Sequence, residues 1–181
     1  MGSRGGRLAR AFGGAWLAVT AFLGGGTAGA QATAGPGVTG ERLQRMNAGE
    51  LDARYRAAAP GAQPRGRVHG LPIVSPGSAM GPTMSRVARV VWQGKVFRDD
   101  GATAVNRFFG VRAIAGKLSY GPSWRDGRPS LILDYQGTSL VYGRYRDEIR
   151  QVAPGVYLGL MYARAKSGPE FTRYFAFETR P

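Results

Sequence analysis

Three acidic side chains within expected β-strands are the best candidates in this sequence for acid–base chemistry. Asp134 follows the apolar residues 131–133, at a position where the period-two pattern predicts burial, and Asp147 and Glu148 lie in the middle of a later strand. Adjacent strand residues point to opposite faces, so Asp147 and Glu148 cannot act together as a pair. Asp134 and one of these two could form a catalytic pair inside a cavity.

A carboxylate inside a β-barrel is costly unless it is paired, and basic residues flank the acidic pair. Arg144, Arg146 and Arg150 are available for this purpose. The acids could therefore form internal salt bridges that close the barrel. They could also provide a polar anchor, or a general acid and base, at the bottom of a pocket. We favour the structural interpretation.

Aromatic side chains in and beside the expected sheet form the second group of candidates. Tyrosines on a cavity wall offer apolar surface together with hydroxyl groups that orient the polar end of a ligand. Packing between sheet and helices would use the same residues. Trp124 belongs to a loop, where it could contact a ligand at the rim or cover the barrel opening. The residues that we predict to bind a ligand are Tyr120, Trp124, Tyr135, Arg146, Asp147, Tyr157 and Tyr162.

Other catalytic groups are scarce. The chain has no cysteine and one histidine, His69, so a zinc site of His and Cys ligands lacks its parts and a Ser-His-Asp triad would depend on His69 alone. We interpret His69 as a partly exposed strand residue. Residues 66–70 have no strand before them and no helix after them, which argues against a dinucleotide loop. We expect no metal and no cofactor.

The N-terminal segment has the order of a secretory signal peptide. Three arginines precede an apolar run at residues 11–23, and small residues follow up to Ala30. The run is shorter than the roughly 20 residues that a membrane-spanning helix needs. We expect residues 1–30 to be removed on export, no transmembrane segment to remain, and the protein to be secreted or periplasmic. Residues 31–46 then form a flexible leader, and residues 47–181 a single β-barrel domain.

Two short helices are expected before the sheet. Asn47 and Glu50 have the spacing of a capping box, which predicts a helix at residues 47–58. Pro82 in a first turn begins a second helix that ends near Trp92. The first helix would dock through Leu51 and Tyr55. The second carries an apolar stripe that predicts packing on the core, formed by Met84, Val87, Ala88 and Val91.

From Gly94 onward the hydrophobic period falls from about 3.6 to 2, which predicts a sheet. The joints between candidate strands contain Gly, Pro or Asp and are too short for parallel crossovers, so neighbouring strands must be antiparallel. The predicted fold is mainly β, an antiparallel meander forming a small barrel or half-barrel, with two short N-terminal helices. The expected strands are residues 67–74, 95–98, 113–120, 130–135, 142–152, 156–164 and 171–178.

Charge points to an anionic partner. The chain carries 25 basic and 11 acidic residues, a formal net charge of +14 at pH 7. Such a charge attracts lipid headgroups and lipopolysaccharide. The basic residues are nearly all arginines scattered singly, with no run of five or six. We expect an anionic envelope surface as a possible partner, and no nucleic acid.

Four segments occur in a recognisable order, at residues 92–97 (WQGKVF), 133–135 (LDY), 146–150 (RDEIR) and 153–159 (APGVYLG). This order resembles uncharacterised bacterial proteins related to the GXWXG barrel family, over residues 50–178. The resemblance implies a calycin-like barrel, similar to lipocalins, fatty-acid-binding proteins and nitrobindins. The family is named after the motif GXWXG. Residues 66–70 (GRVHG) have both glycines of this motif, but Val68 stands where the motif has Trp. Nitrobindin-like barrels bind haem through a late histidine, and because none follows His69 a tyrosine would be the remaining route to haem.

Three hypotheses for function follow. The first is an exported barrel that binds a small apolar or amphipathic, lipid-like molecule by burying ligand carbon in its interior. The second is an enzyme, isomerase-like or cyclase-like, with Asp134 and either Asp147 or Glu148 as acid and base. The third is a cationic module held on an anionic envelope surface. We favour a binding protein over an enzyme.

Overall fold

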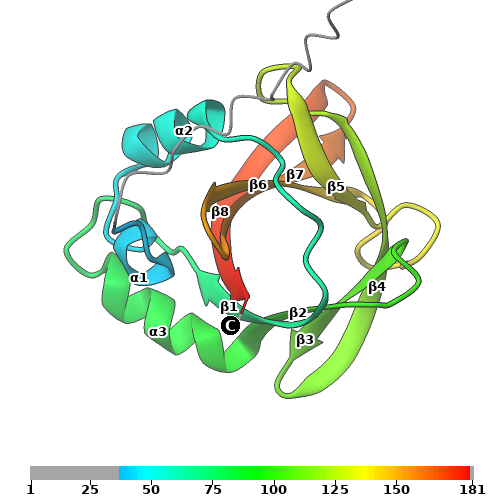
Figure 1. The fold of residues 1–181 in the computed structure, drawn as a ribbon, viewed down its shortest axis with the longest axis horizontal. Helices are drawn as coiled ribbons and strands as arrows, with labels where there is room; N and C mark the ends of the chain where they lie inside the picture. Colours follow the sequence, from blue (N-terminus) through cyan, green and yellow to red (C-terminus); the bar gives the residue numbers. More distant parts are fainter. Residues whose placement is uncertain (1–36, 180–181) are drawn as a thin grey trace, which may run out of the picture. The chain divides into compact units, whose positions relative to one another are not determined.

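Eight antiparallel strands follow one another around a closed barrel, and the last strand pairs with the first (Figure 1). The computed structural model of the protein describes residues 37–179, so the predicted signal peptide lies outside the described residues. The mainly β class, the antiparallel meander and the short helices are confirmed. The strands are β1 (Gly66–Pro72), β2 (Trp92–Phe97), β3 (Thr103–Phe108), β4 (Val111–Pro122), β5 (Pro129–Asp134), β6 (Tyr145–Ala153), β7 (Val156–Ala165) and β8 (Gly168–Thr179).

Strand β3 was absent from the predicted strands because its pattern is irregular. Residues 103–108 read TAVNRF, and Asn106 is a buried polar residue on the side where alternation would require an apolar one. Its pairing with β4 nevertheless runs from Thr103 opposite Lys117 to Phe108 opposite Val111. The predicted strand at 142–152 begins later than expected, since residues 142–144 belong to a turn.

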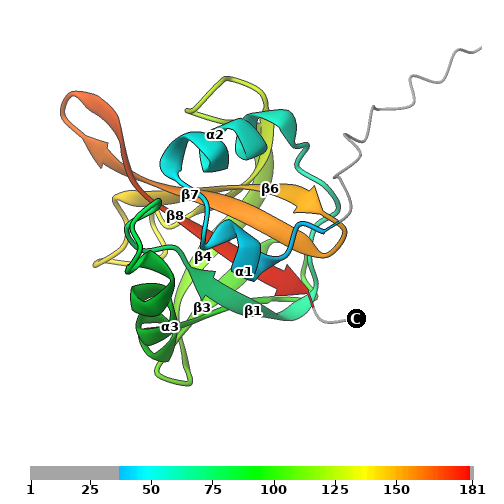
Figure 2. The same cartoon turned by 90° about the vertical axis from the view of Figure 1, so that its left-hand side faces the viewer.

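Helices α1 (Gly40–Leu43) and α2 (Ala48–Ala57) lie outside the barrel (Figure 2). The predicted capping box is present: the Asn47 side chain accepts from the Glu50 amide at 3.0 Å, and the Glu50 carboxylate accepts from the Asn47 amide at 2.8 Å. Leu51 and Tyr55 are fully buried, as predicted for the docking face. No helix among residues 37–179 has the length and apolar character required to cross a bilayer.

The predicted flexible leader is wrong for residues 38–46. Val38, Leu43 and Met46 are buried in the core beneath the helices, and the Gln44 side chain donates to the Pro72 carbonyl at 2.7 Å. Three apolar side chains spaced along a short segment are sufficient to anchor it, although the overall composition is that of a linker. The remaining leader residues, 31–36, lie outside the described part of the chain.

Helix α3 (Gly81–Val91) begins with Pro82 in its first turn and ends before Trp92, as predicted. The prediction that its apolar stripe packs on the core is wrong. Met84, Val87 and Val91 are exposed, whereas the helix buries Gly81 and Ser85. A Cβ at Gly81 would lie 2.7 Å from the Ser75 carbonyl oxygen. The helix therefore packs closely against residues 74–75 through its smallest side chains.

The barrel wall separates two apolar cores. The inner core includes Phe97, Leu131, Leu133, Ile149 and Phe177. The outer core lies between the barrel and helices α1 and α2. It includes Leu158, Leu160 and Tyr162, which lie on the outward face of β7. Two apolar faces on β7, visible in the sequence as an almost continuous apolar strand, therefore serve two separate packing layers.

Gly159 on β7 makes room for an aromatic ring inside the barrel. A Cβ at this position would overlap the ring of Phe175, its partner on β8. We expect Gly159→Ala to lower the free energy of unfolding by about 1–3 kcal/mol, because the ring must move within a packed interior. Chemical denaturation monitored by circular dichroism measures this change. Gly121→Ala is the control, since a Cβ there meets Ile132 at an ordinary 3.6 Å. Equal stability of the two variants would contradict the prediction.

Candidate ligand-binding site

A pocket of about 360 Å³ enters the barrel beside α3. This volume is at the small end of the range of small-molecule sites. Its walls combine aromatic and aliphatic side chains, and its mouth includes Arg173 on β8. The aromatic residues are Trp92, Phe108, Tyr142, Tyr145, Tyr174 and Phe175, and the aliphatic residues include Ile73, Val74, Ala88, Val91 and Met161.

Four polar side chains form the inner end of this pocket, and we call them the polar floor: Lys95, Asn106, Tyr135 and Asp147. Each is at most 3% exposed. The Lys95 ammonium donates to Asp147 Oδ2 at 2.7 Å, to Asn106 Oδ1 at 2.8 Å and to the Tyr135 hydroxyl at 3.0 Å. Tyr135 in turn donates to Asp147 Oδ2 at 2.6 Å, and Asn106 Nδ2 donates to the Tyr135 hydroxyl at 2.8 Å.

The closed barrel brings these residues together from distant strands. Lys95 and Asn106 are direct partners on β2 and β3. In the ring of eight strands, β2 and β6 are four apart in either direction, so the ion pair between Lys95 and Asp147 joins opposite walls (Figure 1). Tyr135 reaches the same point from the end of β5.

A bulge in β2 turns Lys95 inward. The register between β2 and β3 shifts between Trp92 and Lys95, and such a shift re-aims the following side chain. Gly94 within this bulge has a φ of 110°, and a Cβ there would lie 2.6 Å from the Val68 carbonyl oxygen. Glycine is therefore required where β2 passes directly against β1.

The polar floor is electrostatically self-contained. An ammonium group has three hydrogens, and Lys95 has one acceptor for each of them, as expected of its charged form. Burial lowers the pKa of Lys95, while the carboxylate of Asp147 opposes this shift. Burial also raises the pKa of Tyr135 well above its ordinary value, and the negative charge of Asp147 acts in the same direction. Tyr135 is therefore a neutral hydroxyl at physiological pH.

Some polar groups of the pocket remain available to a ligand. Asp147 Oδ2 accepts two hydrogen bonds, whereas Oδ1 has no partner among residues 37–179. The hydroxyls of Tyr142 and Tyr145 likewise make no hydrogen bond within this part of the chain. Arg173 is close enough to Tyr142 that its charge opposes the raised pKa which burial gives that tyrosine. The pocket can therefore accept a hydrogen bond at its floor and meet an anionic group at its mouth.

Two of the seven residues predicted to bind a ligand, Tyr135 and Asp147, line this pocket. Tyr157 faces the barrel interior away from the pocket, where its ring stacks on Phe177 at 4.9 Å and its hydroxyl donates to the Ala62 carbonyl. Tyr120 is half exposed and donates to the Gly61 carbonyl at 3.2 Å.

The other three, Trp124, Arg146 and Tyr162, meet on the outside of the barrel. The Arg146 guanidinium lies 4.3 Å from the Trp124 ring, and Trp124 packs edge-on against Tyr162. Trp124 therefore covers part of the outer core and does not stand at the mouth of the pocket.

The acids predicted to work in pairs lie in three separate places. Asp147 points inward. Glu148 points outward, where it accepts from the Ser123 hydroxyl at 2.5 Å and the Trp124 amide at 2.8 Å, and pairs with Arg146 at 3.2 Å. Asp134 is about one third exposed and pairs with Arg164 at 2.6 Å, so its predicted burial is wrong. Alternation along β5 continues to Tyr135 and places Leu131, Leu133 and Tyr135 in the inner core, so Asp134 lies on the outer face.

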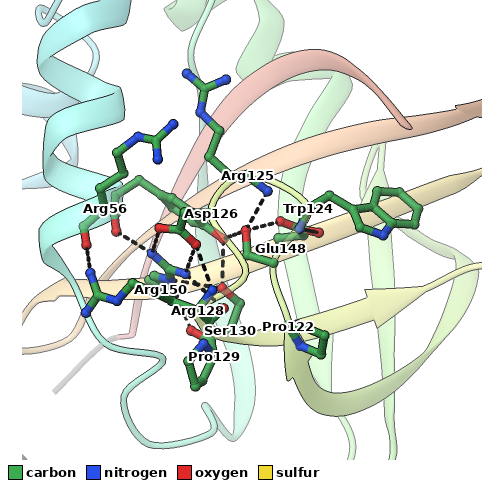
Figure 3. Close-up of polar contacts among 12 residues, drawn as sticks. Arg56, Pro122, Trp124, Arg125, Asp126, Arg128, Pro129, Ser130, Glu148 and Arg150 are labelled. Carbon is green, nitrogen blue, oxygen red and sulfur yellow. Dashed lines mark hydrogen bonds and ion pairs between the residues drawn. The ribbon is translucent and has the colours of Figure 1, made fainter. Parts of the chain in front are cut away.

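A second buried polar network surrounds Arg150 outside the barrel (Figure 3). The fully buried guanidinium binds both oxygens of Asp126, at 2.6 and 2.8 Å. It also donates to Ser130 and to the carbonyl groups of Tyr55, Arg128 and Pro129. The network fastens the β4–β5 loop and α2 to β6. Arg150, proposed as a partner for an internal carboxylate, therefore pairs outside the barrel.

Lys95 and Asn106 belong to the floor and were missed as site residues. Within residues 95–98, Lys95 shares a face with Phe97, and Val96 shares a face with Arg98. Each face thus holds one apolar and one basic residue, so alternation could not decide which faces inward. The available signal was the need of a buried Asp147 for a cation.

His69 lies on β1 and lines an outer groove together with Arg67. In the part of the chain that the structure describes, no three potential ligands among His, Cys, Asp and Glu gather into a metal site.

The chain forms a closed antiparallel eight-stranded barrel, an architecture that fits a calycin-like barrel. No protein-family model matches the chain, and a comparison with curated proteins found no match. Among solved structures, the chain is similar to a crystal structure of a protein from Thermomonospora curvata. The two share 18% identity over 76% of this chain and 90% of the other, with a TM-score of 0.49.

Proposed function

We propose that the barrel binds a small amphipathic molecule with an apolar body and a hydrogen-bond donor at its inner end. The observation that carries the proposal is the aromatic pocket that ends at Asp147, whose Oδ1 is unpartnered within residues 37–179. The walls would bury ligand carbon at about 25 cal/mol per Å². Arg173 and the hydroxyls of Tyr142 and Tyr145 would face a polar or anionic group near the mouth.

The proposal also includes export of the protein from the cytoplasm and a relationship to known families of barrel proteins. The order of residues 1–30 supports a role outside the cytoplasm. Relationship to the GXWXG-type or nitrobindin-like barrels is supported by residues 92–97, which supply Trp92 and Lys95 to the pocket.

A variant that closes the pocket tests the proposal. Ala88 lines the pocket from α3, so Ala88→Trp should fill its mouth, whereas Val87→Trp places the same ring at a position 67% exposed. With 1-anilinonaphthalene-8-sulfonate as a fluorescent amphipathic probe, we expect Ala88→Trp to bind at least about tenfold more weakly, which corresponds to roughly 55 Å² of lost apolar contact. Val87→Trp should bind like the wild type. Equal weakening of both variants, or of neither, would remove the pocket as the binding site.

Native mass spectrometry of protein purified from its own host should then reveal the copurified ligand.

A second candidate function, proton-transfer catalysis, is favoured by the contact between Tyr135 and Asp147 at 2.6 Å. Asp147 would act as the base and Tyr135 as the acid. If Asp147→Asn copurifies with a compound chemically different from that bound by the wild type, the enzyme is supported; the same compound in both supports the binding protein.

A further inference from the structure

Helix α3 exposes an apolar stripe that the barrel does not cover. Met80, Met84, Val87 and Val91 recur at three- or four-residue spacing, and each is between 43% and 67% exposed. Apolar side chains gathered on one exposed face of a helix indicate a surface that contacts a partner or a membrane.

Two loops extend this surface around the mouth of the pocket. The Phe109 amide donates to the Val91 carbonyl at 3.0 Å, which holds the β3–β4 turn against the end of α3. The rings of Phe108 and Tyr142 are 6.1 Å apart, which joins that turn to the β5–β6 loop. Figure 2 shows α3 and the two loops at the same end of the barrel. We call the exposed apolar residues at this end the mouth patch: Met80, Met84, Val87, Val91, Phe109, Val111, Leu140 and Val141.

Positive charge borders the mouth patch. On the other side of α3 lies a groove of about 640 Å³, which we call the arginine groove. It is lined by one acid, Glu41, and by four arginines: Arg45, Arg67, Arg86 and Arg89. None of these four guanidinium groups forms an ion pair within residues 37–179. The segments that form the patch, residues 80–91, 109–111 and 140–141, contain no acidic residue. Apolar side chains next to unpaired arginines complement a bilayer that carries anionic headgroups.

We propose that the mouth patch docks on an anionic lipid bilayer, with the arginine groove receiving lipid phosphates. The pocket mouth includes Val91 of this patch, so docking would bring the pocket opening against the lipid surface. Docking would allow an amphipathic ligand to pass directly between the membrane and the barrel, and this use of the arrangement rests on the proposed function. The docking itself does not rest on the proposed function.

Vesicle sedimentation of the purified protein, expressed from its full chain, tests the docking. We expect binding to phosphatidylcholine vesicles containing phosphatidylglycerol, and little binding to pure phosphatidylcholine. Arg86→Glu/Arg89→Glu should weaken binding to the anionic vesicles by roughly 10- to 100-fold, since each basic residue at an anionic surface contributes about a factor of five. Met84→Ser/Val87→Ser should weaken binding by at least about tenfold, because about 55 Å² of lost apolar contact is sufficient for such a change.

The charge control is Arg65→Glu/Arg98→Glu. It has the same net charge as Arg86→Glu/Arg89→Glu, but both residues are exposed near the end of β1 and β2 where Gly66 pairs with Phe97. This control should keep most of the binding. An equal loss in the two charge variants would show attraction by net charge alone and would overturn the proposal.

Two further results would also overturn it. The first is an absence of sedimentation with anionic vesicles. The second is a dimer that dissociates in Met84→Ser/Val87→Ser, since a second copy would then cover the patch. Vesicle binding is measured without any pocket ligand, and probe binding is measured without vesicles. Loss of one with retention of the other therefore separates failure of the docking from failure of the proposed function.

Discussion

Replacing Lys95 by methionine is expected to lower the free energy of unfolding by about 3–5 kcal/mol, because it leaves the Asp147 carboxylate buried without its counter-ion. Methionine fills a similar volume, so the effect reports the lost charge and hydrogen bonds more than a cavity. The substitution also removes a donor to the hydroxyl of Tyr135 and a donor to Asn106. Urea unfolding monitored by circular dichroism and by tryptophan fluorescence measures the change.

The double variant Lys95→Met/Asp147→Leu separates the charge from the packing. Replacing both members of a buried ion pair by apolar residues is often neutral or stabilising, so we expect the double variant to recover most of the loss. A double variant that is less stable than Lys95→Met would show that Asp147 contributes to stability without the lysine. If Lys95→Met is as stable as the wild type, the ion pair does not stabilise the barrel.

The polar floor also shapes stability at alkaline pH. The folded-state pKa of Lys95 lies below its ordinary value of 10.5, so between these two values the unfolded chain binds more protons and this residue makes stability rise with pH. Tyr135 acts in the opposite direction: its folded-state pKa is raised, so its contribution is complete below pH 10.0 and is lost as the pH rises further. In Lys95→Met, the rise of stability with pH that Lys95 causes should therefore be absent, whereas the loss of stability above pH 10.0 that Tyr135 causes should remain.

The inward position of Asp147 could be predicted from the sequence, whereas its partner could not. Asp147 and Ile149 share one face of a strand, and Ile149 belongs to the inner core. Lys95 is 52 positions earlier and reaches Asp147 because the barrel closes with β2 opposite β6. Strand alternation specifies faces within a strand, but the meeting of opposite walls depends on the number of strands, and β3 had not been predicted.

Helix α3 shows a different limit. Its periodicity correctly predicted a helix with one apolar face, but periodicity does not identify what covers that face. The two buried residues of the helix, Gly81 and Ser85, pack against residues 74–75 just after β1, and the Ser85 hydroxyl accepts from the Val74 amide at 3.0 Å. Small residues permit a close backbone approach that the larger apolar residues on the other face would prevent. The same feature that made the packing prediction wrong leaves the mouth patch open to solvent.

Replacing Arg150 by methionine is expected to cost about 3–5 kcal/mol of unfolding free energy, because an ion pair between a fully buried guanidinium and a carboxylate that is 7% exposed loses one member. Asp126 would lose both of its guanidinium contacts, and the Tyr55 carbonyl at the end of α2 would keep the Ala58 amide as a donor but lose the guanidinium. The guanidinium also stacks on the Tyr55 ring at 4.3 Å, so α2 loses packing as well. Denaturant unfolding gives the magnitude, and hydrogen exchange should show faster opening of α2 and of the β4–β5 loop than of the inner barrel strands.

Arg128→Met is the matched control for Arg150→Met. Arg128 lies in the same loop, but it is exposed and its side chain donates to the Arg56 carbonyl, so its loss should cost no more than about 0.5 kcal/mol. Arg150 also lowers the pKa of Asp126 below its ordinary 3.8, which means that the wild type gains stability above that pH and loses it as the pH falls further. In Arg150→Met this acid-dependent loss should become smaller. Arg150 acts on the helix through its contacts with Asp126 and Tyr55. If both variants lose the same unfolding free energy and the acid dependence of stability is unchanged, the Arg150 network does not hold α2 to the barrel.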